Sequence, residues 1–194
     1  MTDQYQAFTQ SPLGKFVVKN LGLPSPAALD RFESAQPVVN GAVLLGAAPS
    51  STISASIAQI LSNIHADSYV GNNVELQQIA AKVGLNLRPL NADDKESKFK
   101  AVVFDASGIQ NSEQLKELYN FFNPIARQIS NSGRVIVIGT TPETAKTVKQ
   151  AIAQRALEGF IKSVGKEFKK GITAQVVYVD EGAADNIEST LRFL

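Results

Sequence analysis

Two patterns of apolar residues alternate along this chain. Short continuous apolar runs are typical of strands buried on both faces of a sheet, and apolar residues recurring every three or four positions are typical of helices that bury one face. The continuous runs predict strands over residues 42–45, 101–105, 134–139 and 174–180. A short stretch at residues 67–70 and an alternating stretch at residues 85–90 predict two further strands. The recurring patterns predict helices over residues 53–61, 72–83, 112–130, 142–170 and 185–194. Because strands and helices alternate throughout, we expect an α/β fold: a three-layer α/β/α sandwich with a mainly parallel sheet.

Residues 1–40 precede the first predicted strand and have a different character. Their apolar residues share one helical face that is interrupted near Gly14 and Gly22, namely Phe8, Leu13, Phe16, Val17, Leu21 and Leu23. Prolines follow, with room between them for one or two helical turns over residues 27–32. We therefore expect an N-terminal helical arm over residues 1–40, which wraps its own domain or docks on a neighbour, and a domain over residues 41–194.

The composition narrows the possible functions. In 194 residues with 44% hydrophobic and 19% charged residues, one globular domain is the default. The net charge of +1 gives no general attraction to nucleic acid or to an acidic membrane, so neither is expected as a partner. The sequence contains no cysteine, which excludes disulfides, thiolate catalysis and cysteine-ligated metals. No apolar run approaches the ~20 residues of a membrane span and the first residues lack a signal-peptide core, so a cytoplasmic location is expected.

The turn at residues 46–52 lies where an α/β fold can bind the phosphates of a nucleotide, between the first strand and the first helix. The glycines that let the backbone approach a pyrophosphate are missing from it. Ser50, Ser51 and Thr52 could bind a phosphate through their hydroxyls, but serine and threonine cap helices of every kind. Capping is the favoured interpretation of these three residues.

Four stretches resemble short-chain dehydrogenases/reductases, in the order that this family has them. Residues 41–61 resemble the first strand, turn and helix of the family, and Phe104-Asp105-Ala106-Ser107-Gly108 stands where the family has N-N-A-G. Residues 133–140 resemble the strand that ends at the catalytic serine. Residues 156–173 resemble the active-site helix and the next strand. More narrowly, the chain resembles the N-terminal domain of high-molecular-weight 3-oxoacyl-acyl-carrier-protein reductases. This resemblance rests on Leu21-Gly22-Leu23-Pro24, on residues 152–160 and on residues 188–194.

The resemblance implies a Rossmann- or flavodoxin-like fold in which the working residues of the family have been replaced. The three glycines of T-G-x-x-x-G-x-G fall on Ala48, Thr52 and Ser54. The catalytic serine falls on Thr140, and the tyrosine and lysine of Y-x-x-x-K fall on Gln150 and Gln154. Glutamine is neither a phenolic acid nor a cation that lowers the pKa of a tyrosine. No catalytic, cofactor-binding or metal-binding residue is therefore expected in this segment.

In that branch a degenerate domain precedes a complete reductase domain, which reduces 3-oxoacyl thioesters with NADH or NADPH in fatty acid synthesis. The resemblance therefore implies a non-catalytic structural and interaction domain, with the active site of the parent protein beyond residue 194. The expected partners are the C-terminal reductase domain, a second copy bound through the helices at residues 112–130 and 142–168, and the acidic acyl carrier protein. A docking patch for the carrier protein would be Lys162, Lys166, Lys169 and Lys170, although cations also suit the end of a helix.

Two other classes of function stay open. One is an independent domain that binds a nucleotide, flavin or acyl group in the crevice at the carboxyl edge of the sheet. The other is a free-standing enzyme with an unfamiliar site around Asp105 and Thr140.

Three further groups of residues favour a structural interpretation. His65 is the only histidine, and the sequence offers no motif with a nucleophile or an orienting acid for it. Asp93, Asp94 and Glu96 are interleaved with lysines that would repel a cation, so they predict a solvated loop. Tyr119, Phe121 and Phe122 point in different directions on one helix, so part of this aromatic cluster is expected in the core.

Overall fold

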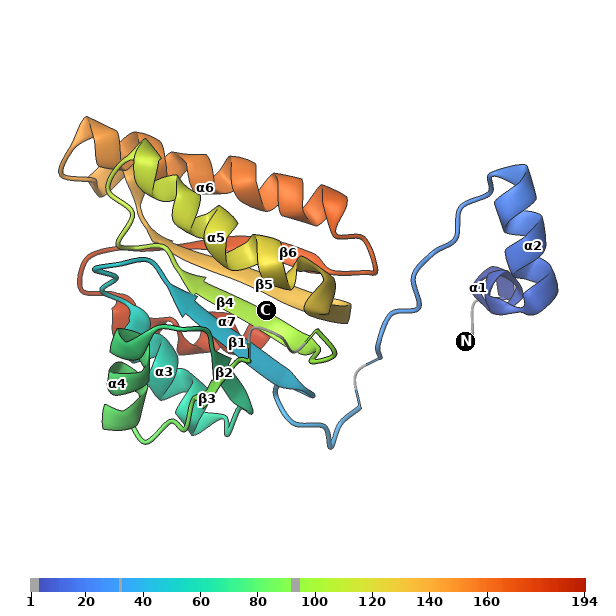
Figure 1. Cartoon of the computed structure of the whole chain (residues 1–194), viewed down its shortest axis with the longest axis horizontal. Coiled ribbons are helices and arrows are strands. Elements are labelled where there is room, and N and C mark those ends of the chain that lie inside the picture. The colour runs from blue at the N-terminus through green and yellow to red at the C-terminus, as the bar shows by residue number, and fades with distance from the viewer. Residues whose placement is uncertain (1–3, 32, 92–94) are drawn as a thin grey trace.

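A parallel sheet lies at the centre of the protein. The computed structural model describes residues 4–31, 33–91 and 95–194, and within them six parallel strands form one sheet in the order β3-β2-β1-β4-β5-β6 (Figure 1). The strands are β1 (Ala42–Ala47), β2 (Ser68–Val70), β3 (Arg88–Pro89), β4 (Phe99–Asp105), β5 (Ile129–Thr140) and β6 (Thr173–Val179). The helices that cover the sheet are α3 (Ser54–Asn63), α4 (Val74–Lys82), α5 (Lys116–Ile125), α6 (Val148–Glu167) and α7 (Glu188–Phe193).

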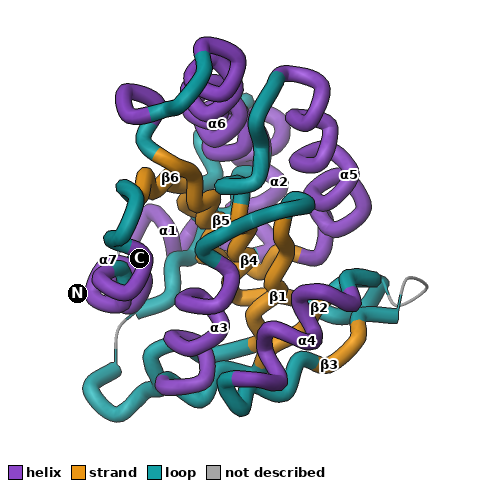
Figure 2. Tube along the Cα trace, turned by 90° about the vertical axis from the view of Figure 1, so that its left-hand side faces the viewer, coloured by secondary structure: helices purple, strands orange, loops and turns teal. Residues whose placement is uncertain are grey.

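Side chains that alternate along the strands fill two hydrophobic cores, one on each face of the sheet. Val43 and Leu45 point to one face and pack with α3 and α4, and α7 covers the same face. Leu44 and Val102 point to the other face and pack with α5 and α6. Figure 2 shows the sheet between these two layers of helices. The predicted three-layer α/β/α sandwich with a parallel sheet is therefore confirmed.

The helix predicted over residues 112–130 is divided into three pieces. A 3₁₀ turn (η1, Ser112–Leu115) precedes α5, and another (η2, Ala126–Gln128) follows it. Pro124 lies in the last turn of α5, where it removes a hydrogen-bond donor from the helix. β5 then begins at Ile129 rather than at residue 134, because Ile129 is buried and pairs with Phe99 before the register between β4 and β5 shifts.

The helix predicted over residues 142–170 is shorter at both ends. α6 begins at Val148, and the cap is Thr147 rather than Thr141, which precedes a separate 3₁₀ turn (η3, Pro142–Thr144). At the other end, three consecutive residues have left-handed φ values and reverse the chain. They are Lys169 at 50°, Lys170 at 53° and Gly171 at 70°.

The strand predicted over residues 85–90 is reduced to the two residues of β3. Leu85 and Leu87 are buried in the core with α3 and α4, but Pro89 has no N–H with which to continue the ladder. The described part of the connection from β3 to β4 contains no helix.

The N-terminal arm contains a helical hairpin that stands apart from the sheet (Figure 1). Its helices are α1 (Gln4–Gln10) and α2 (Pro12–Leu21), and α2 ends at Gly22, whose φ is 64°. Gly14 lies inside α2 and not at an interruption. A side chain at this position would collide with the backbone at the end of α1. The extended segment that follows does not form the predicted turns over residues 27–32 in its described part. Asp30 joins it to the sheet through an ion pair with Lys100.

No helix among the described residues is long and apolar enough to cross a membrane.

Candidate functional site

The order of the strands reverses between β1 and β4. From β1 the sheet continues to β2 and β3 on one side, and from β4 it continues to β5 and β6 on the other. In open parallel sheets, ligands bind beyond the carboxyl ends of the strands at such a reversal. The turn at residues 48–53 and the segment at residues 105–109 lie at this position, because they follow β1 and β4.

The carboxylate of Asp105 occupies the N-terminus of α3. Its Oδ2 accepts hydrogen bonds from Ile53 N at 3.1 Å and from Ser54 Oγ at 2.7 Å, and its Oδ1 accepts one from Ser107 N at 3.0 Å. Asp105 is fully buried, with 0% of its surface exposed. The positive end of the α3 dipole is thus satisfied by a carboxylate of the chain itself. The signal for this role in the sequence is an acid as the last residue of a buried strand, but the sequence does not say which helix it caps.

The hydroxyls of the turn do not cap α3, so this interpretation of Ser50, Ser51 and Thr52 is wrong. Ser51 Oγ donates instead to the backbone oxygen of Asp105 at 2.9 Å, and Thr52 N donates to Ser107 Oγ at 2.8 Å. Ser50 is exposed and has a φ of 61°. The turn is bound to the end of β4 because the partners of these groups lie there.

Ala48, Thr52 and Ser54, which the resemblance aligns with the glycines of the phosphate turn, take part in the contact between the turn and the end of β4. Ala48 is 4% exposed, and its N–H donates to the backbone oxygen of Asp105 at 2.8 Å. Ser54 is 2% exposed and gives its hydroxyl to the Asp105 carboxylate, whereas the side chain of Thr52 stays at the surface. A Cβ on Gly108 would collide with a carbonyl of the turn, so no space separates the two segments.

The side chain of Gln154 holds the ends of β4 and β5 together. Gln154 Oε1 accepts a hydrogen bond from Thr140 N at 2.9 Å, and Nε2 donates to Ala106 O at 2.9 Å and to Ile109 O at 2.8 Å. Gln154 is fully buried, and Gly139 leaves room for it, since a Cβ there would lie 2.5 Å from Gln154 Oε1. This residue is structural here, because all three of its bonds go to the backbone.

Gln150 and Thr140, the other two positions that the resemblance singles out, form no proton relay with Gln154. Gln150 Oε1 accepts a hydrogen bond from Lys146 N at 3.0 Å, at the start of α6. Thr140 Oγ1 is buried and has no hydrogen-bond partner among the described residues. An alcohol without an adjacent base is a weak nucleophile and a weak acid, so these side chains offer no general acid for reduction of a carbonyl.

Tyr178 on β6 is the tyrosine of this region, and the sequence analysis did not single it out. Its hydroxyl donates to the backbone oxygen of Gln154 at 2.8 Å. Burial and the negative charge of Glu158 raise the pKa of Tyr178 to about 12. Glu158 is itself held ionised, because its hydrogen bond with Arg155 lowers the pKa of the carboxyl. A proton donor needs a lowered pKa, so this phenol is shifted in the wrong direction for that task.

The remaining predicted residues are dispersed. His65 is exposed beyond α3, at the amino edge of the sheet, and Glu96 is exposed. Asp93 and Asp94 lie outside the described residues, and residues 4–31, 33–91 and 95–194 hold no cluster of three metal-ligating side chains. Lys162 and Lys166 are exposed on α6, and Lys169 and Lys170 belong to the left-handed turn after it.

The aromatic cluster divides between core and surface, as the sequence predicts. The ring of Phe122 packs on Phe104 and Phe160 at centroid distances of 5.9 and 5.1 Å, and Phe121 lies 4.9 Å from Phe104. Tyr119 is 66% exposed.

A cavity of about 440 Å³ lies beside the turn, between the ends of β1 and β2 and α5. Phe104 and Phe121 form its apolar part, and Asn120, Glu75 and Glu117 form part of its polar wall. The two carboxylates would repel a phosphate, so this cavity suits an uncharged or cationic group.

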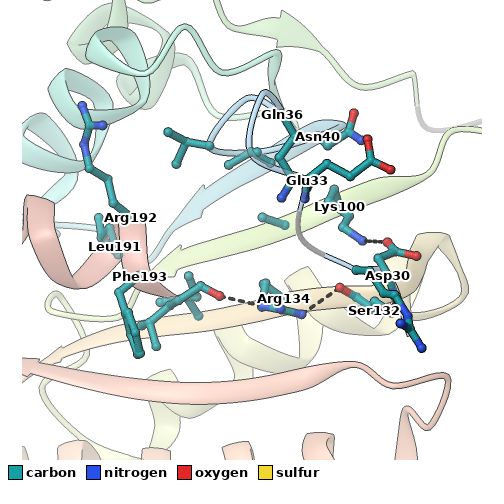
Figure 3. A pocket seen from close by; sticks show the side chains of 16 residues that line it. Asp30, Glu33, Gln36, Asn40, Lys100, Ser132, Arg134, Leu191, Arg192 and Phe193 are labelled. Atoms are coloured by element: carbon teal, nitrogen blue, oxygen red, sulfur yellow. Dashed lines mark hydrogen bonds and ion pairs between the residues drawn. The ribbon is translucent and has the colours of Figure 1, made fainter. Parts of the chain in front are cut away.

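A second cavity, of about 570 Å³, lies at the opposite edge of the sheet, below the amino ends of β4 and β5 (Figure 3). Lys100 pairs there with Asp30, and Arg134 donates to the backbone oxygens of Ser132 at 2.8 Å and Leu194 at 2.6 Å. These contacts join the arm, the sheet and the end of α7. Lys100 and Arg134 are thus bound to groups of the chain.

Comparison with solved structures shows the fold of short-chain dehydrogenases/reductases. A short-chain dehydrogenase/reductase from Serratia marcescens superposes with a TM-score of 0.59 at 14% identity, over 82% of this chain and 91% of that chain. BdcA in complex with NADPH superposes with a TM-score of 0.52 at 19% identity, over 72% and 70% of the two chains. BdcA from E. coli gives a TM-score of 0.52 at 18% identity, over 80% and 94%. At these identities the likeness shows a Rossmann-like fold, not a shared activity. A scan against known protein families and a search of curated proteins find no match.

Proposed function

We propose that this chain is a non-catalytic structural and interaction domain of a 3-oxoacyl-acyl-carrier-protein reductase, whose reductase domain uses NADH or NADPH. The proposal combines the observed fold with the motifs that resemble the N-terminal domain of that branch. The observation that carries the non-catalytic part is the buried carboxylate of Asp105 at the N-terminus of α3.

A dinucleotide would meet two obstacles at this position. Its pyrophosphate is an anion, and the backbone N–H groups that would receive it already donate to Asp105 or to Ser107. The carboxylate would also repel the phosphates, and this repulsion is strong because the site is buried. Gln150 and Gln154 stand where the proton-donating pair of the family would stand, so the reaction centre is replaced together with the cofactor turn.

The experiment is a calorimetric titration of the purified chain with NADPH and NADH. No saturable binding is expected up to about 1 mM, which corresponds to less than about 4 kcal/mol of binding free energy. BdcA serves as the positive control, since it is seen in complex with NADPH. A dissociation constant in the micromolar range for this chain would overturn the proposal.

The parent protein is tested by its reading frame. We expect codons after Leu194 to encode an intact T-G-x-x-x-G-x-G and Y-x-x-x-K. A stop codon directly after Leu194 would refute the assignment to a reductase, without affecting the titration.

The interactions proposed for the domain are with its reductase domain, with a second copy through α5 and α6, and with acyl carrier protein. Val148 and Ile152 are 75% and 60% exposed on α6, which leaves apolar surface for such contacts.

Changing Lys162, Lys166 and Lys169 to Glu should weaken binding of the acidic carrier protein to the full protein. Charge reversal of Lys15 and Lys19 on the arm is the matched control, and equal affinity of both variants would remove this partner.

A second candidate function is a ligand-binding domain, and the cavity of about 440 Å³ favours it. The buried ring of Phe104, the half-buried ring of Phe121 and the amide of Asn120 suit a planar, uncharged group such as a flavin ring. Titration with riboflavin and FMN tests this candidate, and FMN should bind more weakly because Glu75 and Glu117 oppose its phosphate.

A further inference from the structure

The two edges of the sheet differ in how they are protected against pairing with another strand. β3 forms one edge and consists only of Arg88 and Pro89. A charged residue, a proline and a short length are three devices by which proteins block an edge. β6 forms the other edge and has none of them.

β6 offers a long and regular edge. Its seven residues, TAQVVYV, include no charge, no proline and no glycine. It pairs with β5 in continuous register from Thr173 to Val179 without a bulge. The first six residues are half-buried, and among the described residues β5 is the only strand bound to it. The N–H and C=O groups on the outer side of β6 therefore have no strand partner in the described chain.

The charges beside β6 indicate which strand fits this edge. Lys169 and Lys170 precede β6, and Asp180 and Glu181 follow it, and all four are exposed. Glu181 also pairs with Lys146 of its own chain, with 3.7 Å between Oε1 and Nζ. An antiparallel copy of the same segment would place the lysines of one chain beside the acids of the other. A parallel copy would place like charges together, which is unfavourable.

We propose that β6 pairs with β6 of a second copy of this chain, antiparallel and about a two-fold axis through Val176, so that the two sheets form one continuous sheet. Val176 is the centre of the seven-residue strand, and full overlap of the strands puts it on the axis. About such an axis, side chains that lie on one face of the sheet in one copy meet side chains on the same face in the other copy. Tyr178 then stands opposite Ala174, a large side chain against a small one.

Gln175 supplies a second observation. Its Oε1 is buried and has no hydrogen-bond partner among the described residues. In the proposed pairing, Gln175 of each copy lies diagonally opposite Gln175 of the other, at roughly 7–8 Å and within reach of a long side chain. Because Oε1 is buried within its own chain, each side chain has to rotate toward the edge before the two amides can bond to each other.

The absence of cysteine makes a direct test possible. In the proposed dimer the two Val176 residues face each other with Cα atoms about 5 Å apart, whereas the two Ala174 residues lie about 14 Å apart. We expect Val176→Cys to give a cross-linked dimer under oxidation or with a short bismaleimide. Ala174→Cys, on the same face of the same strand, is the matched control and should stay uncross-linked.

Charge reversal tests the pairing without touching the core. Lys169→Glu with Lys170→Glu should weaken the dimer roughly tenfold in sedimentation equilibrium, and Asp180→Lys should weaken it less. Glu181 is left unchanged because it pairs with Lys146 of its own chain. Combining the three changes should restore part of the lost affinity.

Three results would overturn the proposal. They are a monomer at the highest soluble concentration, a dimer with no gain of cross-linking at Val176 over Ala174, and a dimer that cross-links through Ile152→Cys on α6 instead. A cross-link through Ile152→Cys would support the α5–α6 contact of the proposed function. A cross-link at Val176 alone would leave that contact without support. Failure of the β6 pairing can therefore be told apart from failure of the α5–α6 contact.

Discussion

Asp105 and Gln154 are polar residues, yet both are completely buried at the carboxyl edge of the sheet. Each has hydrogen bonds to compensate for its burial, as buried polar groups require. Asp105 receives three donors and Gln154 binds three backbone groups. At the scale of the residue, the donors at the start of α3 and at the ends of β4 and β5 are bonded to side chains of the chain itself.

Replacing Asp105 by Asn should lower the free energy of unfolding by about 2–4 kcal/mol. The amide keeps the shape but loses the charge, and it can face only some of the three donors with its oxygen. Urea unfolding measures the change. Asp185→Asn is the control, because Asp185 is exposed and accepts one bond, from Ser56 Oγ at 2.8 Å; it should cost under about 0.5 kcal/mol. Equal losses in the two variants would contradict the role given to Asp105.

Tyr178 should make stability depend on pH in the alkaline range. Its pKa is about 12 in the folded protein and near 10 in the unfolded chain, so the folded state binds the proton more tightly. The contribution of protonated Tyr178 to the free energy of unfolding is complete below about pH 10 and is lost as the pH rises through about 12. Urea unfolding at pH 8 to 11.5 should show a smaller decline for Tyr178→Phe than for the natural chain. Parallel curves for the two proteins would refute the shift.

At the scale of the element, α6 lies close to β5 because Gly139 has no side chain. A Cβ at this position would lie 2.5 Å from Gln154 Oε1 and 2.6 Å from Leu157 Cδ1. The fit of one glycine therefore sets how closely the longest helix covers the sheet.

Gly139→Ala should destabilise the protein by about 1–3 kcal/mol, because Gln154 and Leu157 must move in a close-packed core. Gly159→Ala is the matched control on α6. An added Cβ there meets nothing within 4 Å, and alanine should stabilise the helix by about 0.5–1 kcal/mol. Thermal unfolding of both variants measures the difference. A loss of stability in both, or in neither, would show that contact with Gln154 is not the cause.

At the scale of the whole molecule, the arm and the sheet are joined mainly by the segment around Asp30. The α1–α2 hairpin bonds to this segment, with Tyr5 Oη donating to Pro24 O at 2.7 Å and Gln6 Nε2 donating to Ala27 O at 3.1 Å. Its apolar residues remain at the surface, with Leu13 71% and Phe16 70% exposed. Both side chains are thus left uncovered by the sheet in the described chain.

Removing residues 1–24 should therefore change the free energy of unfolding of the remaining chain by less than about 1 kcal/mol. Urea unfolding at low protein concentration measures it, so that contacts between copies do not contribute. Asp30→Ala in the full chain is the control, because it breaks the ion pair with Lys100 that the truncated chain keeps. A loss of several kcal/mol on truncation would show that the hairpin packs on its own sheet.

The sequence by itself determined the class of fold, because each strand and helix buries a face whose period is visible in a short window. The strands at residues 101–105 and 134–139 and the helix after residue 53 needed no knowledge of distant residues. The ends of elements were less certain. Thr141 and Thr147 are both good caps, and only the packing of α6 on β5 selected Thr147.

The tertiary structure alone decided what the turn after β1 does. Ser50, Ser51 and Thr52 predict a cap from within the turn, and that cap does not form. The cap is Asp105, 52 positions beyond Ile53, and the parallel register of β1 and β4 brings it there. A local pattern holds no information about that register, because the pairing of strands is fixed by burial across the whole sheet.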